Sequence, residues 1–388
     1  MPRDRMVVIH SFPVWLPQTQ TWMYNQLKYL PDSVEAHVVC ERTEHLDQFS
    51  VPNIHCLKDV SKVQYFWEKA ARYSGFPQYR QYLQKIAKTV QAGILHSHFG
   101  HIGWFDLQPA KKAGIKHVVT YYGSDVGLLP TRNVEWRSRY RKLFDQADLF
   151  LCEGPFMARQ LIGLGCPAEK VRVHHLGIPV ETIPFKPRRW RAGEPLNVLI
   201  AASFRVKKGI PYALESLGLI QKTVPVEITI IGDSVSEPGS AEEKRRILEL
   251  IDKGGLKSRT KLLGFQPYRA VFEEAYKHHV FMSPSVTAPD GDSEGGAPVT
   301  LIEMIATGMP VISTKHCDIP EVVQNGIDNW LVAERDAAGL ADKLLWLVGH
   351  AGHWAEMLAS GRSHVEREFN AARQGGRLYE IYQEMLKK

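Results

Sequence analysis

The chain has 388 residues, of which 44% are hydrophobic and 23% are charged, the composition of an ordinary soluble globular protein. The length is too great for one ordinary core and fits two α/β domains. Lysine and arginine outnumber aspartate and glutamate by 48 to 42, for a net charge of +6. So modest an excess suits anionic ligands or a membrane surface and gives no reason to expect a nucleic-acid partner.

The N-terminal segment and the cysteines indicate a cytoplasmic protein. Met6–His10 is an apolar run that is too short and too interrupted for a signal peptide, and we expect it to form a buried strand. No apolar stretch approaches the length that spans a bilayer. The five cysteines are scattered and never form a C-x-x-C pair, so we expect reduced thiols and neither a disulfide framework nor a zinc site. They are Cys40, Cys56, Cys152, Cys166 and Cys317.

Apolar runs alternate with helical patterns along the whole chain, which predicts parallel sheets built from βαβ units. The strands expected in the first half are Met6–His10, Ala36–Cys40, Gly93–His96, His117–Tyr121 and Asp148–Cys152, with helices such as Thr21–Tyr29 and Ile102–Ala113 between them. Those expected in the second half are Asn197–Ala202, Val226–Gly232, Lys261–Leu263, Val280–Ser283 and Val311–Thr314, with a helix at Ala241–Lys253.

A polar segment rich in proline and glycine, Phe185–Pro195, separates the two halves and is expected to be a linker. We therefore expect two doubly wound domains, residues 1–187 and 195–370, that face a cleft. The last helix, residues 371–388, is expected to cross back to the N-terminal domain. Ligands of such sheets bind at the carboxyl ends of the strands.

The stretch Ser283–Glu321 is the most informative part of the sequence. It reads SPSVTAPDGDSEGGAPVTLIEMIATGMPVISTKHCDIPE: a strand end, an acidic glycine-rich loop, a helix that starts at Pro298 and a returning strand. Proline suits the first helical position. A glycine-rich loop that leads into a helix N-terminus offers free backbone N–H groups and the positive end of the helix dipole. The stretch therefore predicts a diphosphate site.

Two glutamates of this stretch are candidate ligands of a nucleotide sugar. Glu303 lies in the helix between the apolar Ile302 and Met304, where a carboxylate can accept hydrogen bonds from both ribose hydroxyls. Glu294, in the loop, could do the same for sugar hydroxyls. The alternative is that Glu294 is a solvated loop residue and that Glu303 caps the helix or faces water. The Gly-Gly turn, the helix start and the apolar neighbours favour a site.

The stretch resembles the acidic signature of the family 4 retaining glycosyltransferases, which adopt the GT-B fold. In that family the first glutamate contacts the donor sugar and the second the ribose, and the resemblance implies these roles for Glu294 and Glu303. The family has seven residues between the two glutamates, whereas this chain has eight, Gly295 to Ile302. The extra residue falls in the loop, so the role of Glu303 carries over more directly. The other residues expected to bind the donor are Gly232, Gly295, Gly296, Ala297 and Thr300.

A basic cluster follows the strand that opens the second domain, where residues 201–209 read AASFRVKKG. An enzyme that expels a nucleoside diphosphate must stabilise the negative charge that develops on it, and without a metal Arg and Lys side chains are the natural means. Taken alone, such a cluster is usually a solvated turn. Family 4 members have an Arg, a short spacer and Lys-Gly here, so the resemblance implies that Arg205 and Lys208 bind the phosphates. Arg205 lies nearer to the lysine than in the commonest family spacing.

Two segments of the first half follow strands and are expected to line the cleft: LHSHFG at 95–100 and TYYGSDV at 120–126. They resemble elements of the family branch that builds exopolysaccharide repeat units of the colanic-acid type. The family has a histidine near the donor sugar and leaving phosphate where this chain has Tyr122. A phenol can donate a hydrogen bond but carries no positive charge near pH 7. His98 could substitute for that histidine, or it could be a structural residue.

Three further residues of this half are expected on the acceptor side. Gln18 and Thr19 belong to another segment that matches the branch, Gln18–Thr21, which follows Phe12-Pro13. Asp125 could orient the site or cap the following helix.

The segment Lys62–Lys88 combines basic and aromatic side chains. Six Lys or Arg residues stand against one acid, Glu68, with seven aromatic residues interleaved. Such a stretch suits an anionic membrane face. The alternative is a helix hairpin with its aromatic side chains in the core. Similar family members act on lipid-linked acceptors, which favours peripheral binding to the inner face of the membrane.

Together these features predict a retaining, metal-independent GT-B glycosyltransferase without a cofactor. We expect it to move a hexose from a nucleotide sugar, most simply a UDP-hexose, to a glycan or polyprenyl-linked acceptor in polysaccharide biosynthesis. One alternative is a non-catalytic nucleotide-sugar-binding subunit, which Tyr122 and the altered glutamate spacing would fit. Another is a GT-B epimerase that acts on a UDP-sugar.

Overall fold

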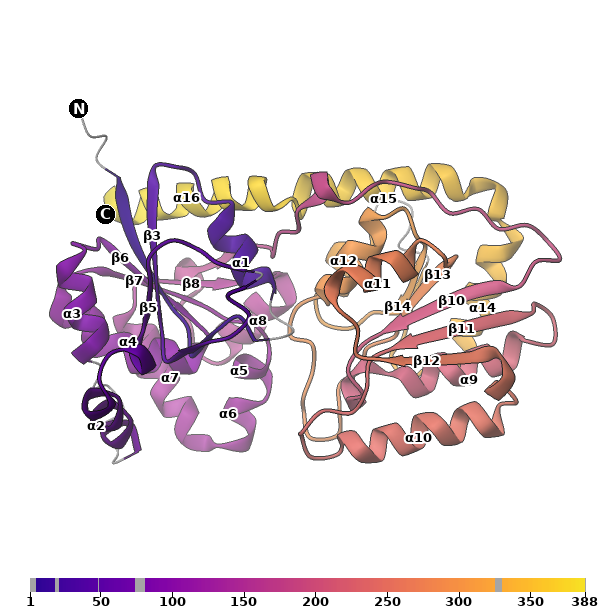
Figure 1. Ribbon diagram of the computed structural model, residues 1–388, viewed down its shortest axis with the longest axis horizontal. Helices are drawn as coiled ribbons and strands as arrows, with labels where there is room; N and C mark the ends of the chain where they lie inside the picture. The colour runs from indigo at the N-terminus through magenta and orange to yellow at the C-terminus, as the bar shows by residue number, and fades with distance from the viewer. Residues whose placement is uncertain (1–4, 18–20, 48, 74–80, 325–329, 388) are drawn as a thin grey trace. The chain divides into compact units, whose positions relative to one another are not determined.

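The computed structural model describes residues 5–17, 21–47, 49–73, 81–324 and 330–387 (Figure 1). The chain divides into two compact units. Residues Met1–Pro179 and Asn370–Lys388 form the first, and Val180–Phe369 form the second. The chain therefore passes between the units twice, and the last helix belongs with the N-terminal residues.

Seven of the described strands of the first unit form a parallel sheet with the order β5-β3-β1-β6-β7-β8-β9, and β2 (Val14–Trp15) pairs separately with β4 (Arg42–Thr43). The bounds of the seven strands are β1 Met6–Ser11, β3 Val34–Cys40, β5 Ile54–Cys56, β6 Ile94–His98, β7 Lys116–Thr120, β8 Leu149–Cys152 and β9 Val171–Val173. Successive side chains of a strand point to opposite faces, so both faces of this sheet need a cover of helices.

Each face of the first sheet is covered by its own set of helices. Ile9 and Leu95 pack in one core cluster with Leu83 of α3 (Gln81–Thr89) and Ala110 of α4 (Gly100–Ala113). Their neighbours in the strands, Val8 and Ile94, join a different cluster together with three residues of α16 (Ala371–Lys387). These three are Leu378, Tyr382 and Met385. The C-terminal helix is thus a structural part of the N-terminal unit.

The second unit contains a six-stranded parallel sheet, again counted over the described residues, with the order β12-β11-β10-β13-β14-β15. The strands are β10 Leu196–Ala201, β11 Val226–Ile231, β12 Thr260–Gly264, β13 Val280–Ser283, β14 Val311–Thr314 and β15 Leu331–Val332. The principal helices are α9 Ile210–Ile220, α10 Ser240–Lys253, α11 Tyr268–Ala275, α12 Val299–Ala306, α14 Ala337–Gly349 and α15 Trp354–Glu368.

Each sheet has a point at which the strand order reverses. In the second sheet β10 lies between β11, which follows it in the chain, and β13. In the first sheet β1 lies between β3 and β6. Loops that leave the carboxyl ends of two such strands turn to opposite faces and leave a crevice, which is where ligands bind. The loops after β10 and β13 are those that carry the predicted donor residues.

The segment Phe185–Pro195 belongs to the second unit, packs against the rest of it and is not a free linker. The N–H groups of Lys186 and Arg188 donate to the carbonyls of Thr307 and Gly308. The buried Arg188 guanidinium donates to further carbonyls, including those of Ala275 and His278. The division between the units falls at Pro179, before this segment, and not at the predicted residue 187. Proline and glycine mark irregular backbone, which can be packed as well as free.

Candidate functional site

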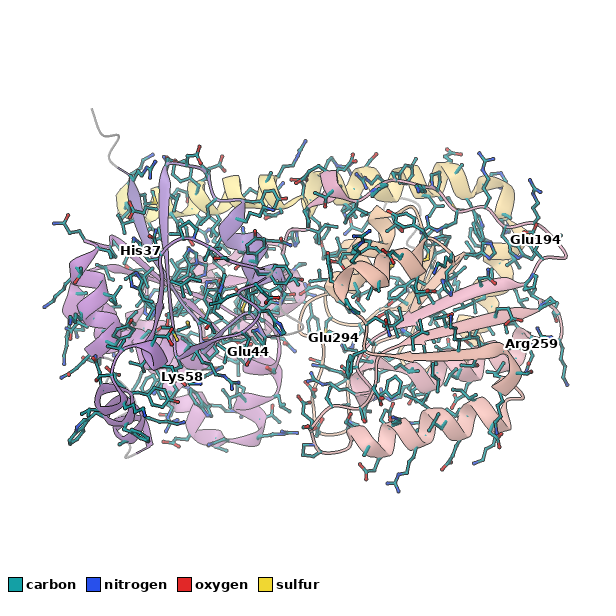
Figure 2. All side chains as sticks on the ribbon, viewed as in Figure 1. His37, Glu44, Lys58, Glu194, Arg259 and Glu294 are labelled. Atoms are coloured by element: carbon teal, nitrogen blue, oxygen red, sulfur yellow. The ribbon has the colours of Figure 1, made fainter. Side chains whose placement is uncertain are left out.

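The loop after β10 approaches the loop after β13 at Gly209, the residue that follows Lys208. Gly209 has a φ of +63°, and a Cβ there would collide with the carbonyl of Pro284. Glycine is required for both reasons. This close approach brings the basic cluster of one loop to the acidic loop of the other. Figure 2 places Glu294 at the opposite end of the second unit's strands from Glu194 and Arg259.

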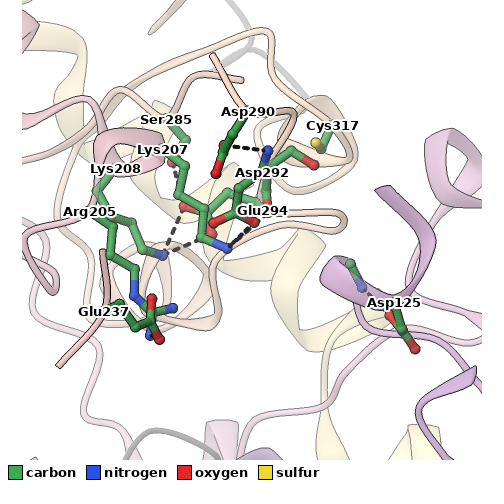
Figure 3. A network of polar contacts seen from close by, with 12 residues as sticks. Asp125, Arg205, Lys207, Lys208, Glu237, Ser285, Asp290, Asp292, Glu294 and Cys317 are labelled. Carbon is green, nitrogen blue, oxygen red and sulfur yellow. Dashed lines mark hydrogen bonds and ion pairs between the residues drawn. The ribbon is translucent and has the colours of Figure 1, made fainter. Parts of the chain in front are cut away.

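Lys208 and Glu294 form an ion pair at this position (Figure 3). The Nζ of Lys208 lies 2.8 Å from both carboxylate oxygens of Glu294, and Ser285 Oγ donates to one of them at 2.8 Å. Burial alone would raise the pKa of Glu294, but the charges of Lys208 and Lys207 and these hydrogen bonds lower it to about 2. Glu294 is therefore ionised at neutral pH, and it is not a solvated loop residue.

The other two cations of the cluster have different partners. Lys207 is buried, and its Nζ donates to Asp292 Oδ1 at 3.1 Å and to the Ser293 carbonyl at 3.0 Å. It therefore fixes the acidic loop. Arg205 is ion-paired with Glu237, and its Nε has no hydrogen-bond partner among the described residues. That nitrogen is buried, but the Arg205 side chain is 33% exposed, and a guanidinium can donate to a phosphate oxygen from its terminal N–H groups.

The loop leads into α12, which begins at Val299, so that Pro298 is the N-cap residue and not the first helical residue. The residues before it are Gly295, which has a φ of +78°, Gly296 and Ala297. Thr300 lies in the first turn and is half-buried. The N–H groups of a first helical turn have no intrahelical partners and can bind an anion. Gly232, at the end of β11, has a φ of +131°, and a Cβ there would collide with the Ala202 carbonyl.

Glu303 lies in α12 and is 4% exposed. Tyr268, at the start of α11, donates its hydroxyl to Glu303 Oε1 at 2.6 Å. Burial raises the pKa of Glu303 to about 7, although the Tyr268 hydrogen bond opposes the shift. Glu303 therefore neither caps the helix nor faces water, and its charge changes near neutral pH.

In the first unit a chain of hydrogen bonds joins the carboxyl ends of the central strands. His10 Nδ1 lies 3.0 Å from His98 Nε2, and His98 Nδ1 lies 2.6 Å from the Tyr122 hydroxyl, which also donates to Gln26. His98 is fully buried, and burial together with the neighbouring His96 and His10 keeps its pKa well below the ordinary value. His98 is thus a neutral residue whose ring contacts Tyr122 and is not itself exposed.

Asp125 holds the backbone around Tyr122. Its carboxylate accepts hydrogen bonds from the N–H groups of Tyr122 and Gly123, both at 3.0 Å, and from Gly100 at 2.8 Å. Burial raises the pKa of Asp125 to about 6, although these N–H groups oppose the shift. The residue thus ties the loop after β7 to the start of α4. Gln18 and Thr19 lie outside the described residues.

Among the described residues, three histidines lie close enough together to share a metal ion. The ligand atoms of His10, His96 and His98 lie within 4.8 Å of one another. However, both ring nitrogens of His96 are hydrogen-bonded, to Tyr382 and Thr120. The rings of His96 and His98 stack at 4.2 Å with an angle of 21°, so their in-plane lone pairs do not converge on one point. The arrangement is that of neutral, hydrogen-bonded core histidines.

Tyr122 lies in the chain of hydrogen bonds between His98 and Gln26. Burial, together with nearby Glu153 and Asp125, raises the pKa of Tyr122 well above its ordinary value. The phenol therefore stays protonated at neutral pH and carries no charge.

Several residues of this site were not among the sequence predictions. They are Lys207, Tyr268, Ser285, His316 and Glu334. Each follows or flanks a strand at the same edge as the predicted residues, which is the one signal that could have found them.

Two family descriptions match the chain. Residues 19–182 match "Glycosyltransferase Family 4", and residues 195–350 match "Glycosyl transferases group 1". The amylovoran biosynthesis glycosyltransferase AmsK of Erwinia amylovora is 35% identical over 288 residues, which are 73% of this chain and 68% of AmsK. The putative colanic acid biosynthesis glycosyltransferase WcaL of Escherichia coli K12 is 32% identical over 292 residues, 74% of this chain and 69% of WcaL.

Solved structures share the fold over nearly the full length. HepE of Anabaena in complex with UDP and glucose has a TM-score of 0.74 at 15% identity and covers 98% of this chain and 100% of its own. A glycosyltransferase of Rickettsia africae has a TM-score of 0.76 at 15% identity, with 99% and 100% covered. These similarities confirm the GT-B fold. With its two matching regions and its relatives above 30% identity, the chain belongs to glycosyltransferase family 4, within the branch that contains the amylovoran and colanic acid enzymes.

Proposed function

We propose that the protein is a retaining, metal-independent hexosyltransferase that uses a UDP-hexose to extend a glycan or a polyprenyl-linked acceptor in exopolysaccharide biosynthesis. The observation that carries the proposal is the Lys208–Glu294 ion pair, which lies at the reversal point of the second sheet. An ammonium group and a carboxylate are held together there, beside a helix N-terminus. These are the groups that a leaving phosphate and a sugar hydroxyl need.

In the proposed reaction each residue binds one part of the donor. Arg205 and Lys208 hold the diphosphate, Glu303 accepts hydrogen bonds from the ribose hydroxyls, and Glu294 binds the sugar together with the backbone N–H groups of residues 295–297. The bond from the anomeric carbon to the phosphate oxygen breaks, and the acceptor oxygen forms a bond to that carbon. The departing phosphate takes the acceptor proton, so no side chain acts as a covalent nucleophile.

The relatives support the acceptor class and the donor base. AmsK and WcaL carry names from amylovoran and colanic acid biosynthesis, both polysaccharides, and HepE was crystallised with UDP and glucose. The decisive experiment incubates the purified protein with UDP-hexoses and a membrane extract that contains polyprenyl-linked glycans. Transfer with retained anomeric configuration, followed by NMR, supports the proposal. Conversion of the UDP-hexose without an acceptor would indicate an epimerase, and binding without any conversion would indicate a non-catalytic subunit.

We expect turnover to survive EDTA, because the charge of the leaving diphosphate is assigned to Arg205 and Lys208. The measurement compares initial rates before and after chelation and after addition of Mg²⁺ or Mn²⁺. A rate that falls to background with EDTA and returns with either metal would contradict this assignment.

We also propose that the protein binds the inner face of an anionic membrane through α2 (Lys62–Tyr73). No described helix combines the length and apolarity required to cross a bilayer. Tyr82 is buried, which fits the core-packing alternative for this part of the segment. In contrast, Val63, Phe66 and Trp67 are 68%, 66% and 70% exposed.

Charge supports an anionic partner for this exposed apolar surface. Lys62 and Lys69 of the same helix are exposed, as is the nearby Lys58, which Figure 2 labels. The one acid of the helix, Glu68, is buried and accepts a hydrogen bond from the Tyr82 N–H at 2.7 Å. Apolar side chains that enter the interface and lysines that attract anionic headgroups act together in this kind of binding.

We expect co-sedimentation with vesicles that contain phosphatidylglycerol in low salt, and much less at high salt, because screening weakens the attraction of the lysines. The double variant Phe66→Ser/Trp67→Ser should lose binding. Leu219→Ser, which changes a side chain 60% exposed in the second unit, is the matched control and should bind normally. Equal binding by all three proteins would contradict the assignment to α2.

A further inference from the structure

Two side chains that were not among the predicted site residues hold the loop that carries Glu294. His316 follows β14 and Glu334 follows β15. Because β13, β14 and β15 are adjacent and parallel, their carboxyl ends meet at one edge of the sheet. Both side chains therefore reach the loop that leaves β13.

The contacts join the two side chains to the loop at two places. The backbone N–H of Glu294 donates to Nε2 of His316 at 3.1 Å. The other ring nitrogen, Nδ1, lies 2.6 Å from a carboxylate oxygen of Glu334. Glu334 also accepts hydrogen bonds from Thr287, at 2.8 Å from the backbone N–H and 3.2 Å from the hydroxyl. Thr287 lies near the start of the loop and Glu294 near its end.

These hydrogen bonds determine which nitrogen of His316 carries the proton. A backbone N–H can only donate, so Nε2 must accept, and the proton of the neutral ring is on Nδ1. Burial alone would raise the pKa of Glu334, but the hydrogen bonds from His316 and Thr287 lower it below the ordinary value. The carboxylate thus accepts from Nδ1–H, and this orients a ring that is only 1% exposed.

We infer that His316 and Glu334 are positioning residues for the donor sugar: they fix the backbone of Glu294 so that its carboxylate stands at the sugar site. The inference rests on the proposed function, in which Glu294 binds the hexose. Eight residues separate Glu294 from Glu303, and a longer loop has more conformations available to it. The hydrogen bond to His316 restricts the backbone at Glu294, the residue that is proposed to bind the sugar.

Nε2 of His316 also lies 3.1 Å from Cys317 Sγ. Two variants of His316 separate the contact of Nδ1 with Glu334 from the contact of Nε2 with Glu294. In His316→Asn the side-chain amide lies where Nδ1 was, so the contact with Glu334 can form while the Glu294 N–H loses its acceptor. In His316→Gln the amide oxygen reaches the former place of Nε2 and can accept from Glu294. Glu334→Gln tests the same arrangement without altering the ring, because an amide N–H can donate to Nδ1 and move the ring proton to Nε2.

We expect His316→Asn to lower kcat with the UDP-hexose that the wild type uses by about tenfold or more, the effect of a small misplacement in an active site. UDP alone should bind within about twofold of the wild type, because its proposed ligands are untouched. His316→Gln should recover most of the rate, and Glu334→Gln should lie between the two. Calorimetry with UDP, steady-state kinetics and thermal unfolding give the three readouts.

Several outcomes would overturn the inference. Equal rates in the Asn and Gln variants would mean that the Glu294 contact does not matter, and equal loss of UDP binding and of rate would mean a general structural role. Glu294→Gln is the reference. If it loses transfer while His316→Asn and Glu334→Gln do not, the proposed function stands and the inference fails. If wild type transfers nothing, or Glu294→Gln is fully active, the proposed function fails instead.

Discussion

Replacing Lys208 by glutamine is expected to lower the rate of sugar transfer by about 10²- to 10³-fold, the usual effect of losing one charged donor that stabilises a developing negative charge. The Lys208 ammonium contacts both oxygens of Glu294. In the proposed reaction the same ammonium binds the leaving phosphate. Single-turnover rates with saturating UDP-hexose would measure the loss at the chemical step.

Lys208→Gln also leaves Glu294, whose side chain is 7% exposed, without its counter-ion, and an unpaired buried charge destabilises a fold. The double variant Lys208→Gln/Glu294→Gln removes both charges. It should unfold near the wild-type temperature and still transfer no sugar at a measurable rate. Lys253→Gln, on an exposed lysine of α10, is the control for a lost positive charge. A double variant that folds and keeps more than about a tenth of the wild-type rate would contradict the phosphate role.

Glu303→Gln is expected to weaken UDP binding at pH 8 by about ten- to a hundredfold, because hydrogen bonds to a charged group contribute roughly 1.5–3 kcal/mol. Burial raises the pKa of Glu303 to about 7. Wild-type affinity for UDP should therefore fall as the pH decreases from 8 to 6, since protonation removes the carboxylate that accepts from the ribose. The terminal phosphate of UDP also takes up a proton at about pH 6, so in calorimetry the variant should keep only the weaker pH dependence that comes from the ligand.

The raised pKa of Glu303 also predicts how the stability of the fold depends on pH: stability should decrease as the pH rises, whereas UDP affinity should increase. A carboxyl group that holds its proton more tightly in the folded chain contributes its full stability below about pH 4.5, and this is lost as the pH rises through about 7. Glu303→Gln has no charge to bury, so at pH 8 it should unfold at a higher temperature than the wild type, and at pH 5 at a similar one. Normal UDP binding by Glu303→Gln at pH 8 would show that Glu303 does not bind the ribose.

The elements that the sequence predicts well are the long buried strands, because a continuous apolar run bounded by turns is a strong pattern. The strands Val280–Ser283 and Val311–Thr314 have the predicted bounds, and Met6–His10 is extended by one residue. The short strands β5, β9 and β15 were not predicted, since two or three residues carry no period. The alternation of strands and helices predicts two doubly wound domains, and the GT-B fold is what the resemblance of Ser283–Glu321 to family 4 implies.

The contacts within the site could not be predicted from the sequence. Lys207 with Asp292, Tyr268 with Glu303, and His316 with Glu294 each join residues more than 20 positions apart. No local pattern encodes such a pair, and only the register of neighbouring strands brings its members together. The burial of a side chain also depends on residues far away in the sequence. The residues around His98 do not show whether its side chain lines a cleft or is fully covered, as it is in the structure.

The return of α16 to the first unit has a consequence for how the protein is made. Leu378, Tyr382 and Met385 complete the core around Val8 and Ile94, yet they are synthesised after the whole second unit. The second unit consists of the uninterrupted residues 180–369 and can fold while synthesis continues. The unit whose synthesis begins first is therefore completed after the second one, and one face of its central strands lacks this part of its cover until α16 has been made.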